Sequence, residues 1–409
     1  ARIAGHTYMV DAARGLTASA VDRGERPSVI SALLKRESTE RMRLVINDAM
    51  DVQGGAGICV GPRNMLASTY QAIPIGITVE GANILTRSMI VFGQGAIRAH
   101  PWLLKELEAA RNPDRRRGLV DFDTALFGHL RFSVSNGIRL FWMGLTGARF
   151  QLAPMGLLEG RYFRYLNQMS TAFVFAADLA LALLGGTMKR KEFLSGRFAD
   201  LLSHMYMGSA ALKRFSDEGR PRADQPLLEW SLRYSLYEGQ QALLAIYDNY
   251  PLRWLGSVLR RVTFPFGPLH TPPNDLLTAR VAATLLAPSE TRERLTEGIF
   301  HPAGPGTPRE RLERALRAVI TAEPVERKLR QALADGRLNG RYVPPFWDKS
   351  LLNQAVASGV IDDGGMRQVL EADALRAEVV QVDAFPQEPL EVRFTTPMVE
   401  RPLRAVGGV

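Results

Sequence analysis

The stretch from Asp51 to Arg87 constrains the fold of this chain most strongly. A long helical pattern ends at a glycine turn, and the apolar segment that follows is interrupted by a single Glu80-Gly81 step. Glycines in such a turn allow positive φ angles and let a ligand approach the backbone closely. A carboxylate between large aliphatic residues is costly to bury unless it is paired or has a chemical role, and desolvation suits a carboxylate to act as a general base.

The composition bounds the class of protein. The chain has 409 residues, enough for two or three domains, with 46% hydrophobic and 23% charged residues, as in globular proteins. The single cysteine, Cys59, excludes an internal disulfide and fits a reducing, cytosolic compartment. No histidine stands at metal-ligand spacing from cysteines or carboxylates, so we predict no metal site. The net charge of +9 favours acidic partners such as anionic lipid or coenzyme A, while the scattered Lys and Arg residues argue against nucleic acid.

Helical periodicity dominates the chain, and no alternating strand pattern appears. We therefore predict an all-α fold: an antiparallel helical bundle at 1–110, followed by a large second helical region. Within that region we expect a second bundle at 119–250 and a further helical extension at 251–383. Residues 251–275, the proline-rich first part of this extension, are predicted to be irregular. Residues 384–409 are rich in proline and predicted to be extended or disordered.

Local signals place several boundaries in the second region. The charged run 111–118 is predicted to be a loop, either a solvated linker or a contact with an anionic surface. Further helices are predicted over 276–287, 308–320 and 324–335, with a last pair within 350–382. Asn274 and Thr307-Pro308 are typical helix starts, because Asn and Thr cap free N–H groups and Pro suits the first turn.

One segment raises the question of a membrane. From Tyr165 to Met188 only Asp178 is charged, and the length would suffice to span a bilayer. An Asp near the middle favours a buried bundle helix, with interfacial contact and a true span as the alternatives. The apolar, weakly basic segment 119–158 is the candidate for a membrane-facing surface.

The glycine turn and the Glu-Gly step together resemble the C-terminal helical domain of the acyl-CoA dehydrogenases, and the longer chain resembles the bacterial long-chain type with a C-terminal extension. Members have a Gly-Gly-x-Gly turn here and a catalytic Glu-Gly roughly two dozen residues later. The spacing from Gly54 to Glu80 is close to that, and the helix running into the turn also fits. The resemblance to the catalytic domain covers roughly residues 1–100, whereas 101–409 resembles the extension alone.

The resemblance implies site residues at matching positions. Glu80 would be the catalytic base that takes the α-proton of an acyl thioester, with its N–H hydrogen-bonded to the thioester carbonyl. Gly81 would permit close approach of the substrate. Arg87 matches a basic residue that would either contact substrate or form an ion pair on the helix surface. The cofactor would be FAD, and the residues implied to contact it are Gln53, Gly54, Gly55, Gly57 and Asn83.

The chain departs from the family pattern at several positions. Asp51 stands where the family commonly has Gln, and its charge would repel a pyrophosphate. Val79 replaces a frequent aromatic residue, and Ala82 cannot donate a hydrogen bond. The second Glu-Gly step, at Glu238-Gly239, lacks a glycine turn at the right distance upstream, so we predict a polar helix position there.

The chain begins without an initiator Met or a signal pattern, and we expect it to be the C-terminal part of a longer protein, inactive without the family's N-terminal and middle domains. The resemblance implies dehydrogenation of long-chain acyl-CoA, the first step of fatty-acid β-oxidation. It also implies electron-transfer flavoprotein as acceptor, a homodimer, and a cytoplasmic location with peripheral contact at the inner membrane. The alternative is a non-catalytic helical scaffold or membrane-peripheral interaction domain, in which Glu80 is a paired core carboxylate.

Overall fold

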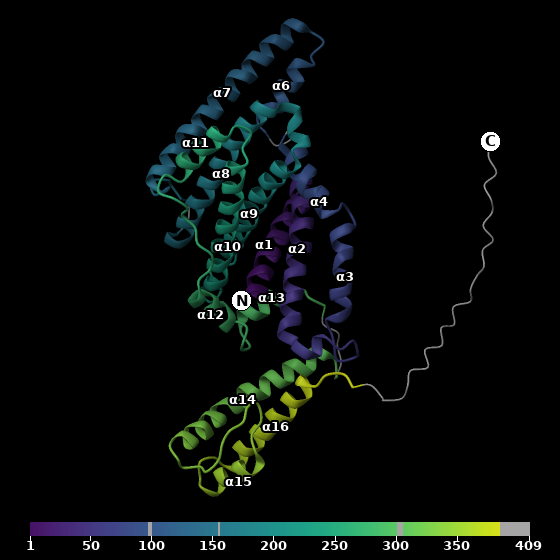
Figure 1. Cartoon of the computed structure of the whole chain (residues 1–409), viewed down its shortest axis with the longest axis vertical. Helices are drawn as coiled ribbons and strands as arrows, with labels where there is room; N and C mark the ends of the chain where they lie inside the picture. The colour runs from purple at the N-terminus through teal and green to yellow at the C-terminus, as the bar shows by residue number, and fades with distance from the viewer. Residues whose placement is uncertain (97–99, 154–155, 301–305, 385–409) are drawn as a thin grey trace, which may run out of the picture.

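The protein is described by a computed structural model (Figure 1). The structure describes residues 1–96, 100–153, 156–300 and 306–384. These residues are overwhelmingly helical, and the one extended pairing found among them is an isolated bridge between Val343 and Phe346. The prediction of an all-α fold is confirmed. The predicted tail at 384–409 lies outside the described residues apart from Ala384.

The helices form two groups along the chain. The first part of the larger group contains α1 (Arg2–Asp22), α2 (Ser28–Gln53), the 3₁₀ turn η1 (Gly54–Gly57), α3 (Ala67–Thr78), α4 (Asn83–Leu85), the π-helix η2 (Thr86–Gln94), α6 (Leu103–Ala110) and α7 (Arg115–Thr146). It continues with α8 (Leu157–Leu184), η3 (Gly185–Arg190), α9 (Glu192–Asp217), η4 (Arg222–Asp224), α10 (Gln225–Asp248), α11 (Arg253–Thr263), α12 (Asp275–Ala283) and α13 (Glu290–Thr296). The smaller group contains α14 (Pro308–Ala334), α15 (Lys349–Ala357) and α16 (Asp363–Val380).

Each group has its own hydrophobic core. The larger core draws on buried residues from Ala4 to Leu295 and is centred on α9, which packs against α10, α1, η2 and α8. The smaller core runs from Ala322 to Ala372 and forms a separate lobe below the main bundle (Figure 1). The predicted division of residues 1–383 into three helical parts stays a prediction.

Two predictions of irregular structure were wrong. The run 111–118 is a loop only at its start, because the Asp114 side chain accepts hydrogen bonds from the N–H groups of Arg116 and Arg117 (3.0 and 3.2 Å) and so begins α7 at Arg115. Within 251–275, the stretch Arg253–Thr263 forms α11, whose buried face packs on α10 and α7. Prolines at the ends of that segment punctuate it without preventing a helix between them.

Helix starts were easier to predict. The Asn274 side chain caps α12 by accepting from the N–H of Leu277 (3.0 Å), and Thr307 caps α14 by accepting from Glu310 (3.3 Å). The predicted break before Pro324 is absent, because α14 continues through this residue to Ala334.

The apolar segment around Asp178 lies in α8. By length and composition, Leu158–Arg190 is the one helical stretch among the described residues that could cross a membrane; α3 with α4 and η2, bent by 44°, would be a second if counted as one span. In the structure α8 packs between α7 and α9, and Asp178 is buried at 5% exposure. It accepts a hydrogen bond from Ser133 Oγ (2.7 Å), which satisfies the carboxylate inside the bundle. The packing of α8 and the partners of Asp178 agree with the bundle-helix alternative.

Candidate active-site region

The three glycines after α2 differ in how strongly the structure requires glycine at their positions. Gly54 has φ +61° and ψ −134°, a conformation that side chains with a Cβ rarely adopt, and it ends the helix. Gly57 is favoured by space, because an added Cβ would make a tight contact of 3.3 Å with the carbonyl oxygen of Met50. Gly55 is neither at positive φ nor crowded, with its closest contact at 3.7 Å. The backbone at Gly54 and Gly55 is therefore open on the side away from the helix.

A cavity of about 590 Å³ lies beside this turn, between it and the C-terminal end of α16. The polar residues that line it with apolar side chains are Gln53, Arg63, Arg311, Glu378 and Gln381, and the backbone of Gly55 also faces it. The Gln53 Oε1 atom is buried and has no hydrogen-bond partner within the described residues. An amide without a partner, an open backbone and two guanidinium groups fit a group that is both anionic and partly apolar, as a dinucleotide is. Asp51, exposed one turn earlier, opposes an anion at the same place.

The end of α16 closes on the loop that follows the turn. The Asp383 carboxylate accepts a hydrogen bond from the backbone N–H of Arg63 (3.0 Å), and the Arg63 Nη1 donates to the carbonyl of Glu378 (3.2 Å). A Cβ added to Gly61 would lie 2.4 Å from the Asp383 Cγ, so this approach requires glycine. Residues more than three hundred positions apart thus form one wall of the cavity.

Glu80 lies just after α3, and its side chain is exposed. Its φ is +54°, and that of Gly81 is +88°, so two consecutive residues adopt left-handed conformations. The apolar residues beside it are exposed as well, with 46% for Val79 and 68% for Ile84. The described residues therefore do not bury Glu80, although its aliphatic neighbours in the sequence suggested a desolvated carboxylate. Gly81 has room for a Cβ, 3.5 Å from the Thr86 Oγ1, so its positive φ rather than close packing requires glycine.

Exposed apolar residues extend along this part of the chain. Between residues 52 and 85 the large hydrophobic side chains with more than a third of their surface in solvent are Val52, Ile58, Val60, Met65, Tyr70, Ile75, Val79, Ile84 and Leu85. Within α3 only Ile73 is buried. Such a concentration of apolar surface is typical of a face that another protein segment or a ligand covers.

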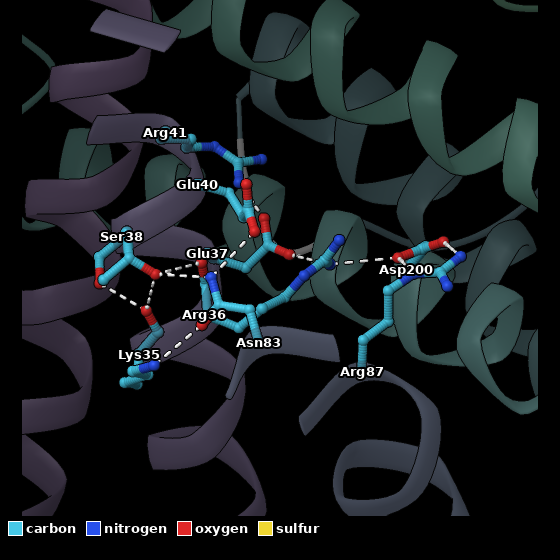
Figure 2. A network of polar contacts seen from close by, with 10 residues as sticks. Lys35, Arg36, Glu37, Ser38, Glu40, Arg41, Asn83, Arg87 and Asp200 are labelled. Atoms are coloured by element: carbon cyan, nitrogen blue, oxygen red, sulfur yellow. Dashed lines mark hydrogen bonds and ion pairs between the residues drawn. The ribbon is translucent and has the colours of Figure 1, made fainter. Parts of the chain in front are cut away.

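Asn83 is fully engaged within the chain. Its two amide hydrogens go to Thr39 Oγ1 and Glu40 Oε1 (both 2.9 Å), and its Oδ1 accepts from Lys35 Nζ (2.9 Å). Figure 2 shows these contacts converging on α2. No amide hydrogen remains for the flavin contact that the resemblance implied, because both are used to attach the turn to α2.

Arg87 forms an ion pair, the second of its two predicted roles. Its guanidinium donates through two nitrogens to the Asp200 carboxylate of α9 (2.8 and 2.6 Å; Figure 2). This two-pronged geometry is the strong form of an arginine–carboxylate contact and raises the pKa of Arg87 further, chiefly through the hydrogen bond to Asp200. The same carboxylate lies 3.1 Å from Arg36 Nη1. Arg87 thus ties η2 to α9.

A buried acid extends this network inward. Glu37 is 3% exposed and pairs with Arg41 and Arg36. Burial by itself would raise the pKa of Glu37, but the two adjacent guanidinium groups outweigh it and lower the pKa to about 2. The carboxylate therefore stays ionised and serves the packing of α2 on α9.

Glu238 lies on α10 and is partly buried, as its predicted polar helix position requires. Burial raises its pKa, and the nearby Arg41 opposes that shift. Close packing explains the glycine at position 239, because a Cβ added to Gly239 would lie 2.6 Å from the Met169 Sδ. The second Glu-Gly step is thus part of the contact between α10 and α8.

The fold also brings together a histidine cluster that sequence spacing did not indicate. Ligand atoms of His100, His129 and Asp178 lie within 4.8 Å of one another. However, His100 Nδ1 accepts hydrogen bonds from the N–H groups of Trp102 and Leu103 (3.2 and 3.0 Å), which places its proton on Nε2, the atom that faces Asp178 at 2.9 Å. A protonated Nε2 has no lone pair for a metal. The cluster therefore acts as a hydrogen-bonded link between α6, α7 and α8.

Residues 97–385 match the family described as acyl-CoA dehydrogenase, C-terminal, bacterial type. The chain belongs to this family. The matched segment begins after Arg87, so the predicted site residues precede it, and their roles depend on the resemblance of residues 1–100 and on the geometry described above.

A solved structure is also similar to this chain. It is an acyl-CoA dehydrogenase complexed with FAD from Bacillus anthracis, with 17% sequence identity and a TM-score of 0.48. The similarity covers 69% of this chain and 46% of that chain. This chain thus spans less than half the length of that dehydrogenase.

Proposed function

We propose that this chain is part of a flavin-dependent acyl-CoA dehydrogenase and supplies its catalytic base, Glu80. Membership of residues 97–385 in the bacterial C-terminal family supports the reaction class. The observation that carries the assignment of the base is the backbone at Glu80. A non-glycine residue in a left-handed conformation costs free energy, and such residues concentrate at functional sites.

In the proposed reaction the Glu80 carboxylate takes a proton from the α-carbon of an acyl thioester. Its backbone N–H donates to the thioester carbonyl oxygen, where negative charge develops in the transition state. The electron pair of the broken α-C–H bond forms the new double bond as a hydride leaves the β-carbon. FAD, when bound, supplies the acceptor for that hydride.

The glycine turn would hold part of the FAD. Gln53, with its unpartnered Oε1, and the open backbone at Gly54 and Gly55 would contact the dinucleotide, and Arg63 and Arg311 would balance its phosphate charge. Gly57 would shape the turn without contacting the cofactor, since its Cβ position faces the carbonyl of Met50.

The exposure of Glu80 supports the proposal that other domains complete the site. A general base works best where water is excluded, and the apolar surface along residues 52–85 is available for a covering segment. We propose that these domains belong to a longer parent protein and that residues 1–409 alone lack dehydrogenase activity. Turnover by this chain with added FAD would contradict that proposal.

The finer features of the proposal derive from the resemblance. They are a long-chain acyl-CoA substrate, a role in the first step of fatty-acid β-oxidation, electron-transfer flavoprotein as acceptor, a homodimer and a cytoplasmic location. The acyl chain length that gives the highest kcat/KM and the oligomeric mass in solution test the first and the fourth of these directly.

The decisive experiment is Glu80→Gln in the full-length parent protein, assayed with a long-chain acyl-CoA and with the bound flavin measured. We expect turnover to fall by at least about a thousandfold while flavin is retained, because an amide cannot take the proton. Glu238→Gln is the matched control and should leave turnover unchanged. Normal turnover of Glu80→Gln would favour the alternative of a non-catalytic helical scaffold for this region.

We also propose peripheral contact with an anionic membrane through α7. Its outward face carries a stripe of large apolar residues, each 44–68% exposed: Phe127, Leu130, Val134, Ile138, Phe141, Trp142 and Leu145. The spacing of three and four residues puts them on one side of the helix. Arg131 and Arg139, also exposed, add positive charge beside the stripe, as in helices that lie in the membrane interface.

Flotation with liposomes containing anionic lipid tests this second proposal. Removing 119–158 would also remove the buried Leu140 and Met143, so substitutions at exposed positions are cleaner. The triple variant Phe127→Ser, Phe141→Ser, Trp142→Ser should lose flotation, and Phe266→Ser, at an exposed loop position, should keep it. Equal flotation of both variants would refute the proposal.

A further inference from the structure

One lysine makes two of the contacts that attach the turn carrying Glu80 to α2. Lys35 Nζ donates to the carbonyl oxygen of Gly81 (2.8 Å) and to the Oδ1 of Asn83 (2.9 Å). Figure 2 shows Lys35 reaching from α2 toward the start of α4, on the opposite side of the network from the Arg87–Asp200 pair. Gly81 and Asn83 lie 46 and 48 positions after Lys35 in the sequence, so these contacts exist only in the folded chain.

The turn needs such an attachment because its conformation is unfavourable. Left-handed φ costs a residue with a Cβ about 1–2 kcal/mol, and Glu80 adopts it directly before Gly81, which does so too. The Glu80 side chain makes no hydrogen bond or ion pair within the described residues, so it does not hold its own backbone. A strained conformation persists only where surrounding contacts determine it.

The remaining contacts of the turn converge on the same helix. Asn83, held by Lys35, donates in turn to Thr39 and Glu40, one turn further along α2. The other contact to the Gly81 carbonyl comes from Thr86 Oγ1 at 3.5 Å, which is too long to be strong. Among the described residues, Lys35 is therefore the one group that joins both the Gly81 carbonyl and the Asn83 side chain to α2 by short hydrogen bonds, each strengthened by its charge.

We propose that Lys35 is a positioning residue for the catalytic base. It fixes the Gly81 carbonyl and the Asn83 side chain, and thereby the direction in which the carboxylate and the N–H of Glu80 point. The inference depends on the proposed role of Glu80 as base. It adds a residue that does not touch the reacting atoms and whose effect is on orientation.

The test uses Lys35→Met in the full-length parent protein, which keeps the length of the side chain and removes both hydrogen bonds. We expect kcat to fall about 10- to 100-fold, because a shift of the base by about an ångström has effects of that size. We expect KM within about twofold and flavin retained. Lys35→Arg, which still donates, should recover part of kcat. Lys213→Met, on the exposed face of α9, is the matched control and should leave kcat unchanged.

A second measurement is independent of catalysis. In the purified chain, amide hydrogen exchange over residues 80–83 should become at least about tenfold faster in Lys35→Met, with α9 and α10 unchanged. Unchanged kcat and unchanged exchange in Lys35→Met would overturn the inference, even if Glu80→Gln abolishes turnover. If Glu80→Gln keeps normal turnover, the proposed function fails, and the exchange data alone then decide whether Lys35 holds the turn.

Discussion

The segment from the glycine turn to α4 and the pair α9–α10 are both helical, yet they are stabilised differently. Fourteen residues of α9 are buried, including Phe198 and Leu201 at 0% exposure, whereas α3 buries Ile73 alone. The turn segment is held instead by polar contacts from α2 and by glycine geometry. The part of the chain with the candidate chemistry is therefore held by contacts that leave its outer surface exposed.

We expect the largest loss of folding stability from a substitution in the bundle core. Phe198 is stacked on Phe92 with ring centroids 4.5 Å apart and packs edge-on against Phe173. We expect Phe198→Ala to lower the free energy of unfolding by about 3–5 kcal/mol, the range for removal of a buried phenyl ring. Ile75→Ser, at a position 60% exposed on α3, should change it by less than about 0.5 kcal/mol. Denaturant unfolding measures the free energy of unfolding of both variants. Similar losses of stability would mean that α9 and α3 do not differ in their contribution to the core.

The next largest effect is a loss of folding stability at low pH, which we expect to arise in the well-packed bundle around α9 and α10. Burial between Trp230 and Tyr234, together with the charge of Arg41, lowers the pKa of His6 from 6.5 to about 4. Between these values the unfolded chain binds more protons at this ring than the folded chain does. Stability should therefore fall as the pH decreases through that window, by up to about 3 kcal/mol from this residue.

His6→Phe isolates that contribution, because it keeps a ring of similar shape that cannot take a proton. The free energy of unfolding measured from pH 7 to pH 4 should fall less steeply in the variant than in the wild type. Parallel curves would show that His6 does not titrate in this way.

We expect the smallest loss of folding stability from substitutions in the glycine turn. Gly54→Ala should cost about 1–3 kcal/mol, because a Cβ is disfavoured at φ +61° and ψ −134° although no atom lies within 4 Å of it. Gly55→Ala, one residue later and at negative φ, should be within about 0.5 kcal/mol of the wild type. Thermal or denaturant unfolding of the two variants tests this. A larger loss of stability in Gly55→Ala than in Gly54→Ala would show that Gly55, and not Gly54, is the position that requires glycine.

Local chemistry predicted from the sequence agrees with the structure where the signal and the consequence lie within a few residues. Asn274 and Thr307 begin helices, Gly54 ends one, and the helical periodicity gives an all-α chain. The predicted loop at 111–118 was wrong for a related reason. Asp114 is a typical helix cap, and the dense charge around it concealed that signal.

The all-α class of fold, the starts of α12 and α14 and the end of α2 at Gly54 could be predicted from the sequence alone, because each follows from the conformational limits of residues close together in the chain. Three features follow only from the packing of the folded chain: Glu80 is exposed, Arg87 pairs with Asp200, and Lys35 contacts the turn. Those contacts join residues 46 to 113 positions apart. Their partners are chosen by the packing of α2 against α9 and η2, and no local pattern in the chain specifies that packing.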